Sequence, residues 1–182
     1  MQAEVTESNY INRLISYSRN MNGLMPDNIF MDNDVTMDLS GLEGMNLLQT
    51  DIEEVSPDVI IIDCLYKIVS GSVSNEIDLK KVITNIDRIR QSHNIAFIFI
   101  HHPRKDQSTE AEEYIGKGIE EMLTSSIFGN WLDTVVKVTS VPPHQDQPDT
   151  VRLDFQKIKN ARQAISPIQV RFNRDRAQFT LS

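Results

Sequence analysis

Residues Pro57–Lys67 have the sequence PDVIIIDCLYK, and this stretch decides the fold. The run Val59–Ile62 is continuously β-branched and ends at Asp63. Because the run has no polar alternation, it predicts a strand buried on both faces. An aspartate at the end of such a strand costs free energy to bury unless a cation meets it. Asp63 is therefore a candidate ligand-binding residue, and a role as the N-cap of a following helix is the alternative interpretation.

A helix and a second apolar strand follow. Glu76–His93 carries apolar side chains at helical spacing, which predicts an amphipathic helix. Its expected inward-facing residues are Ile77, Val82, Ile83, Ile86 and Ile89. Ile95–Ile100 reads IAFIFI and ends at His101 and His102. The order strand, helix, strand predicts a right-handed crossover between parallel neighbours.

The N-terminal third is predicted to contain two more helices. The first spans about 6–20, with Thr6 as its N-cap. The second runs from Ser40 to about Val55, and Pro57 ends it. Its expected apolar stripe is Leu42, Met45, Leu48, Ile52 and Val55. A short strand is a further possibility over residues 28–31.

The pattern changes at Asp133. Four short strands follow, TVVKVTSV, VRLDFQKI, SPIQVRFN and AQFTLS, separated by turn-like segments. The last three alternate apolar and polar residues, as half-exposed antiparallel strands do. A short helix is expected over 117–128. We therefore predict an α/β fold in a single domain over 1–182, with a parallel core over 1–132 and an antiparallel extension over 133–182.

Composition narrows the class of protein. The chain has 182 residues, a net charge of −8 and a pI near 5.0, which argues against a surface that is basic overall. Cys64 is the single cysteine, so an intrachain disulfide is excluded and a cytoplasmic location is expected. We expect Cys64 to be a packing residue rather than a reactive thiol, and Trp131 to lie in the core or an interface. No apolar run approaches the length of a membrane span and no signal-peptide pattern is present, so no membrane partner is expected.

Polar residues follow the predicted strand ends at Glu4, Asp63, His101 and His102. Parallel strands would bring these residues to one edge of the sheet. In one chemistry, Asp63 holds the Mg²⁺ of a nucleotide, Glu4 polarises the attacking water and a histidine senses the γ-phosphate. In the other, all these residues bind a metal ion that activates water directly. Adjacent histidines on a strand point to opposite faces, which disfavours the second chemistry.

Basic residues form two clusters. Arg104 and Lys105 follow the histidines, and Lys157, Lys159 and Arg162 lie in the segment QKIKNAR. Lys157 and Lys159 are two residues apart, so in an extended hairpin they share a face. A solvated turn is the alternative interpretation of the second cluster.

The motifs taken together resemble a known family. VIIIDCLYKIVSG, NIAFIFIHHPRK, LTSSIFGNWLDTVVKV, FQKIKNAR and RFNRDRAQFTL occur here in the order found in the RecA-like ATPase core of RepA-type hexameric helicases. That group is related to DnaB-type replicative helicases and includes phage and plasmid replication ATPases. The resemblance covers nearly the whole chain. It implies a P-loop NTPase fold, ATP and Mg²⁺ as ligands, single-stranded DNA as a partner, and assembly into homo-oligomers, which are hexamers in the family.

The resemblance also assigns roles by position. Asp63 matches the Walker B aspartate, which holds Mg²⁺ directly or through water, and Glu4 resembles the catalytic glutamate. His102 matches the polar residue that couples the γ-phosphate to the DNA-binding loops. The loop that resembles the DNA-binding segment supplies Arg104, Lys105 and Lys117. The basic finger that reaches the nucleotide of a neighbouring subunit would comprise Lys157, Lys159 and Arg162.

One departure from the family is large. The phosphate-binding loop G-x-x-x-x-G-K-[ST] does not occur in this sequence, and the only Gly–Lys pair, Gly116–Lys117, has no strand before it. That loop supplies the N–H groups and the lysine that hold the phosphates. We therefore expect an N-terminally truncated RecA-like module that is inactive alone and prone to association through its exposed sheet. The alternative is a non-catalytic module that pairs with helicase subunits.

Overall fold

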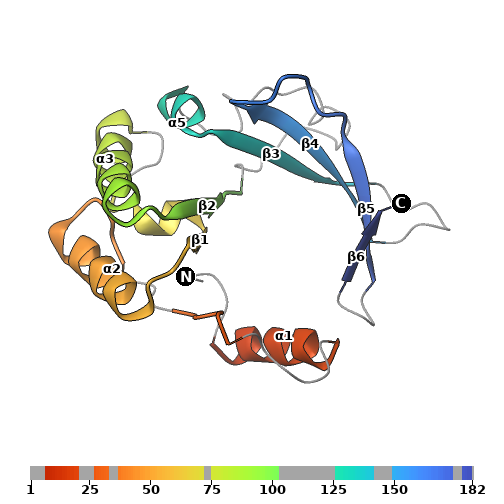
Figure 1. The fold of residues 1–182 in the computed structure, drawn as a ribbon, viewed down its shortest axis with the longest axis horizontal. Coiled ribbons are helices and arrows are strands. Elements are labelled where there is room, and N and C mark those ends of the chain that lie inside the picture. The colour runs from red at the N-terminus through yellow and green to blue at the C-terminus, as the bar shows by residue number, and fades with distance from the viewer. Residues whose placement is uncertain are drawn as a thin grey trace. The chain divides into compact units, whose positions relative to one another are not determined.

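The computed structural model describes residues 7–20, 27–32, 37–71, 75–102, 126–141, 149–173 and 178–181. Its helices are α1 (Glu7–Asn20), α2 (Leu42–Val55), the 3-10 helix η1 (Leu65–Ile68), α3 (Glu76–His93) and α5 (Ser126–Trp131) (Figure 1). Its strands are β1 (Val59–Asp63), β2 (Ala96–Ile100), β3 (Thr134–Ser140), β4 (Thr150–Ile158), β5 (Ile168–Asn173) and β6 (Gln178–Leu181). The chain divides into two compact units. The first unit contains α2 to α5 with β1 and β2, and the second contains α1 and β3 to β6.

The first unit is built on a parallel strand pair. β1 and β2 run side by side in register, from Val59 opposite Ala96 to Asp63 opposite Ile100. α3 connects them along the chain, so the predicted strand–helix–strand arrangement with parallel neighbours is confirmed. The short strand predicted over 28–31 is absent, because the backbone there is a turn followed by irregular structure.

Local signals set the bounds of α3, which agree with the prediction. The side chain of Asn75 accepts a hydrogen bond from the N–H of Ile77 at 2.9 Å and so caps the N-terminus. Acidic residues occupy the first turn and basic residues the last, as the helix dipole favours. Asn94 ends the helix in the left-handed conformation, with φ of 55°.

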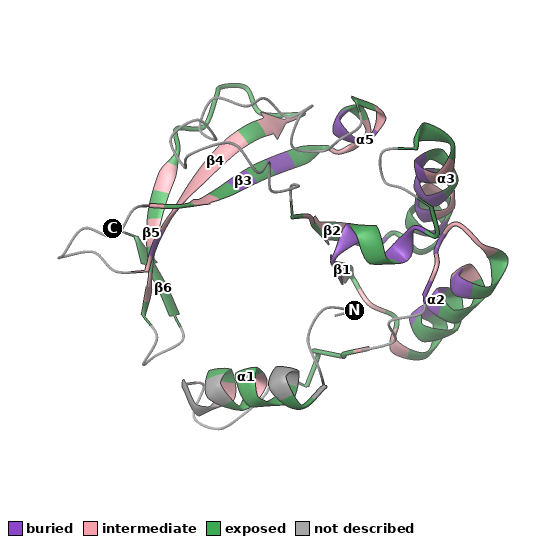
Figure 2. Ribbon diagram, turned by 180° about the vertical axis from the view of Figure 1, so that it is seen from behind, coloured by how far each residue is buried: buried purple, intermediate pink, exposed green. Residues whose placement is uncertain are grey.

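The core of the first unit lies between the helices and one face of the strand pair. The largest buried side chains there are Leu39, Ile62, Leu65, Ile68, Leu79, Val82, Ile86 and Phe128 (purple in Figure 2). Two residues predicted to face inward do not: Leu42 is 84% exposed and Ile77 is 67% exposed. Leu42 is the first residue of α2, and Ile77 shares a helical face with Lys81 and Thr84, which point away from the core.

The expectation that the apolar strands are buried on both faces is wrong. Val59, Ile61, Ile98 and Ile100 are 48%, 49%, 50% and 39% exposed, and together they form what we call the open sheet face. Ile62, on the opposite face, is 1% exposed. Side chains alternate between the two faces of a strand, and no described element of the first unit packs over the open sheet face.

The second unit contains a four-stranded antiparallel sheet in the order β3-β4-β5-β6. The four strands predicted after Asp133 are therefore confirmed, and a bulge lies between Val135 and Val136. Phe172 and Phe179 are directly opposite each other, with ring centroids 4.9 Å apart. The predicted helix over 117–128 falls mostly outside the described residues, and α5 begins at Ser126. In the part of the chain that the structure describes, every helix is too short or too polar to span a bilayer.

Candidate functional site

The carboxyl ends of β1 and β2 bring predicted site residues to one place. Asp63 is the last residue of β1 and lies opposite Ile100, so His101 and His102 directly follow the end of the partner strand. We call this place the carboxyl edge. Oδ1 of Asp63 and both ring nitrogens of His101 are shielded from solvent, whereas His102 is exposed. The two histidines therefore differ in environment, as alternation along an extended chain predicts.

The chain around Asp63 is firmly held. Its neighbours Ile62 and Cys64 are 1% and 0% exposed, and Cys64 is a free thiol that packs in the core as predicted. η1 begins at Leu65 directly afterwards, and its residues Leu65 and Ile68 are both 1% exposed. Buried residues on both sides fix the backbone that carries the Asp63 carboxylate at the strand end.

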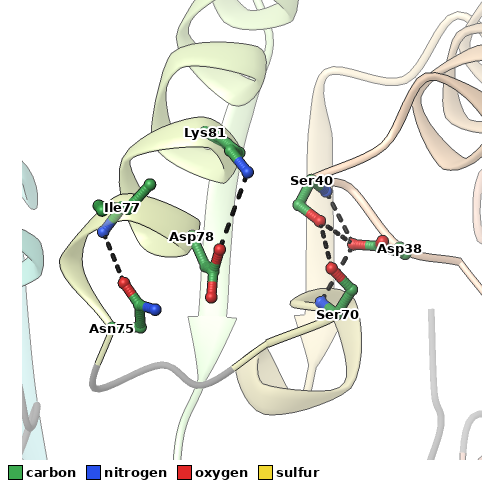
Figure 3. A network of polar contacts seen from close by, with 7 residues as sticks. All are labelled: Asp38, Ser40, Ser70, Asn75, Ile77, Asp78 and Lys81. Carbon is green, nitrogen blue, oxygen red and sulfur yellow. Dashed lines mark hydrogen bonds and ion pairs between the residues drawn. The ribbon is translucent and has the colours of Figure 1, made fainter.

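A polar network ties the chain after η1 to the segment before α2 (Figure 3). Oδ1 of Asp38 accepts hydrogen bonds from the N–H of Ser40 at 2.9 Å, from Oγ of Ser40 at 2.6 Å and from the N–H of Ser70 at 3.2 Å. The two serine hydroxyls are 2.7 Å apart, and the N–H of Leu39 donates to the carbonyl of Ile68 at 2.9 Å. Burial tends to raise the pKa of Asp38, but the hydrogen bonds outweigh it and lower that pKa.

This network was not predicted from the sequence. The only local signal was the Asp-Leu-Ser order, in which an aspartate accepts a hydrogen bond from the backbone two residues later. Its long-range half, the bond to Ser70, has no local signature.

Aromatic packing anchors α5 beside β2. Nε1 of Trp131 donates to both carboxylate oxygens of Asp87 on α3, at 3.0 and 3.1 Å. The Trp131 ring lies 5.6 Å from that of Phe99 on β2 and 5.7 Å from that of Phe128. The predicted packing role of Trp131 is confirmed. β2 is thereby fixed against α5 just before the histidine pair.

The basic segment after β4 belongs to the second unit. Lys157 is half-buried and pairs in register with Val135 of β3. Lys159 is exposed, and its Nζ lies 3.0 Å from Oδ1 of Asp133. Arg162 is also exposed. An exposed ion pair of this kind is weak, so the segment presents solvent-accessible positive charge.

Other predicted site residues lie outside the described residues. They are Glu4, Arg104, Lys105 and Lys117. The structure therefore brings together Asp63, His101 and His102 from the predicted set.

Comparison with known proteins now places the chain in a family. A sequence profile described as an AAA domain matches residues 18–108, which is half of the chain. The chain belongs to the AAA domain family. Among solved structures it is similar to the ATPase domain of a DnaB-like helicase, with a TM-score of 0.69 and 9% sequence identity, over 98% of this chain and 72% of that chain. No curated protein matches the sequence.

The structural similarity confirms the predicted fold class of this AAA domain. Parallel strands with flanking helices, followed by an antiparallel sheet, form a RecA-like ATPase core. The expected α/β class and the resemblance to a RecA-like core are thus confirmed. At 9% identity the match concerns the fold.

An AAA domain uses nucleotide and Mg²⁺ in general, so the carboxyl edge can be tested for its fit to that ion. Mg²⁺ keeps several water ligands and is held by one or two carboxylates together with substrate phosphates. A single carboxylate such as that of Asp63 fits this mode. Among the described residues no group of three or more His, Cys, Asp or Glu side chains is arranged to hold a metal ion. The described part of this AAA domain thus offers no support for the metal-dependent hydrolase considered from the sequence.

Proposed function

We propose that the chain is part of the ATPase core of a replicative DNA helicase, in which Asp63 holds the Mg²⁺ of ATP directly or through water. The supporting observation is the position of the Asp63 carboxylate at the end of a parallel strand, within a RecA-like fold of the AAA family. Ligands of open α/β sheets bind outside the carboxyl ends of the strands. Phosphoryl transfer depends mainly on positioning and on charge stabilisation, which a fixed carboxylate and its ion supply.

The remaining roles complete the proposal. Glu4 polarises the attacking water, and His102 couples the γ-phosphate to the DNA-binding loop. Exposure of His102 beside the end of β1 supports that role. Single-stranded DNA contacts come from Arg104, Lys105 and Lys117.

The proposed active site lies between subunits of a homo-oligomer. The basic finger of Lys157, Lys159 and Arg162 reaches the nucleotide of the neighbouring subunit. Solvent exposure of Lys159 and Arg162 supports this role. Residues 1–182 act as one ATPase domain in this proposal, and hydrolysis coupled to translocation requires a phosphate-binding loop in addition to the motifs of this sequence.

The test is a titration of the purified chain with a fluorescent ATP analogue, with and without Mg²⁺ and single-stranded DNA. Saturable binding that depends on Mg²⁺ is expected, and Asp63→Asn should abolish it because the amide removes the negative charge that attracts the ion. Where turnover is measurable, the same change should lower it by about a hundredfold, the size of effect seen when one electrostatic contact to a transition state is removed.

Asp58→Asn is the matched control. Asp58 immediately precedes β1 at its opposite end and is exposed, so the same chemical change there should leave nucleotide binding intact. Binding or turnover that survives Asp63→Asn would refute the assigned role of Asp63.

A non-catalytic module that pairs with helicase subunits is the second candidate function. The open sheet face favours it, because monomeric proteins rarely expose contiguous apolar surface of this kind. A stable complex with a helicase in the absence of nucleotide binding would support this candidate. Failure to associate with such subunits would count against it.

A further inference from the structure

A pocket lies between the start of α2 and the outer face of α3, within the first unit. Its volume is about 370 Å³, and its walls include Ser40, Leu42, Lys80, Lys81, Thr84 and Asn85. We call it the α2–α3 pocket. None of its residues belongs to the carboxyl edge or to the basic finger, so the proposed ATPase function does not account for it.

Hydrogen bonds hold the polar walls of the α2–α3 pocket in place. Ser40 is fixed by the carboxylate of Asp38, which itself binds Ser70 (Figure 3). Nδ2 of Asn85 donates to the carbonyl of Leu39 at 2.9 Å, which joins α3 to the segment before α2. The pocket is therefore preformed, which reduces the ordering cost of binding.

The pocket is basic although the chain as a whole is acidic. Lys80 and Lys81 both line it and both are exposed, on a chain of net charge −8. Nζ of Lys81 lies 3.8 Å from Asp78, a weak surface contact that leaves its charge accessible. Glu43 in the first turn of α2 is the other acid of the elements that form the pocket entrance. An anionic side chain is the complementary partner for the lysine pair.

Exposed aliphatic side chains accompany this charge. Leu42 lines the pocket and is 84% exposed, and Ile77 is 67% exposed one turn before Lys80 and Lys81 on the same face of α3. An apolar contact beside a charged one is typical of protein–protein interfaces, whereas a surface that binds the nucleic acid backbone is dominated by cations.

We propose that the α2–α3 pocket is a docking site for an acidic, leucine-containing segment of a partner protein. A carboxylate of the segment binds between Lys80 and Lys81. Aliphatic side chains of the segment cover Leu42 and Ile77. The site is independent of nucleotide, because it shares no residue with the carboxyl edge.

The test uses the full chain and fluorescence anisotropy of a labelled helical peptide that carries two glutamates and two leucines on one face. Two matched peptides have the glutamates replaced by glutamine or the leucines replaced by serine. We expect Lys80→Glu and Leu42→Ser each to weaken binding of the parent peptide by about tenfold, a difference that a few lost contacts supply. Both matched peptides should bind correspondingly less tightly.

Arg171→Glu is the control variant. Arg171 is exposed on β5 of the second unit, so this variant makes the same change of charge far along the chain from the pocket residues. It should bind the parent peptide as the wild type does. Circular dichroism should show intact folding in all variants, because Lys80 and Leu42 are exposed and glutamate is a good helix former.

Several results would overturn the proposal. They are no binding of the parent peptide, an equal loss in Arg171→Glu, or unchanged binding in Leu42→Ser together with the serine peptide. The last result would indicate an anion site without a protein partner. Displacement of the peptide by a single-stranded oligonucleotide, lost in Lys80→Glu, would assign the surface to nucleic acid instead. Because every readout is made without ATP, failure here leaves the Asp63 experiment unaffected.

Discussion

Asp38 and Asp63 are both partly buried carboxylates of the first unit, and their surroundings differ. Asp38 accepts three hydrogen bonds on one oxygen from two serines, so its charge is stabilised by the protein itself. Asp63 lies at a strand end where ligands of α/β sheets bind. Asp38 therefore has a structural role, and Asp63 is the residue suited to a bound cation.

Substitution of Asp38 should reveal the energy of its network. Asp38→Asn keeps an acceptor oxygen and loses the charge, so it should destabilise the protein by about 1 kcal/mol after allowance for solvent access. Asp38→Ala removes the acceptor and should cost about 2 kcal/mol. Urea denaturation at neutral pH measures both values. Equal stability of the wild type and Asp38→Ala would contradict the structural role.

The same network predicts a pH dependence. The pKa of Asp38 in the folded protein lies below its ordinary value of 3.8, so the unfolded chain takes up the proton first as the pH falls. The stabilisation is therefore fully present above the ordinary pKa and is lost as the pH falls through the folded pKa. The stability difference between the wild type and Asp38→Asn should narrow in that range, as urea midpoints measured from neutral pH downward would show. A constant difference down to about pH 3 would argue against it.

At the scale of elements, β1 shows what alternation does to a uniformly apolar strand. Ile61 is 49% exposed and its neighbour Ile62 is 1% exposed, although the two residues have the same chemistry. Ile62→Ala should therefore cost about 2–5 kcal/mol through the cavity it leaves. Ile61→Thr keeps a β-branched side chain and should cost less than about 1 kcal/mol. Chemical denaturation of the two variants is the measurement, and similar losses would mean that the open sheet face is covered in solution.

The start of α2 illustrates competition between a local signal and a tertiary one. Ser40 is a good N-cap residue, and the sequence predicted the helix to begin there. In the structure the Ser40 hydroxyl bonds to Asp38 and lies 2.7 Å from that of Ser70, so Gly41 takes the cap position and the helix begins at Leu42. The cap of α3, by contrast, had no competing partner in its prediction, and the helix begins where expected.

At the scale of the whole molecule, the open sheet face predicts association. Apolar surface on a strand pair favours contact with another chain, while the net charge of −8 opposes it. We expect light scattering to show self-association that increases with protein concentration and with salt, which screens the repulsion. The double variant Ile61→Thr/Ile98→Thr should reduce it. A wild-type chain that stays monomeric throughout would contradict the prediction.

Much of the fold was accessible from the sequence alone. Helical spacing and capping residues predicted α3, apolar runs predicted β1 and β2, and alternation predicted the antiparallel strands after Asp133. Those signals are local, because the period of side chains along an element depends only on its backbone geometry. The position of Asp63 at a strand end followed from the same local pattern.

Tertiary structure alone decided which apolar residues are covered. Leu42, Ile61 and Ile77 have the side chains of core residues but are exposed, because no described element of the first unit packs against them. It also decided the Asp38–Ser70 hydrogen bond, whose partners are 32 residues apart in the chain. Contacts of this kind depend on how distant segments meet, and a pattern of neighbouring residues carries no record of that meeting.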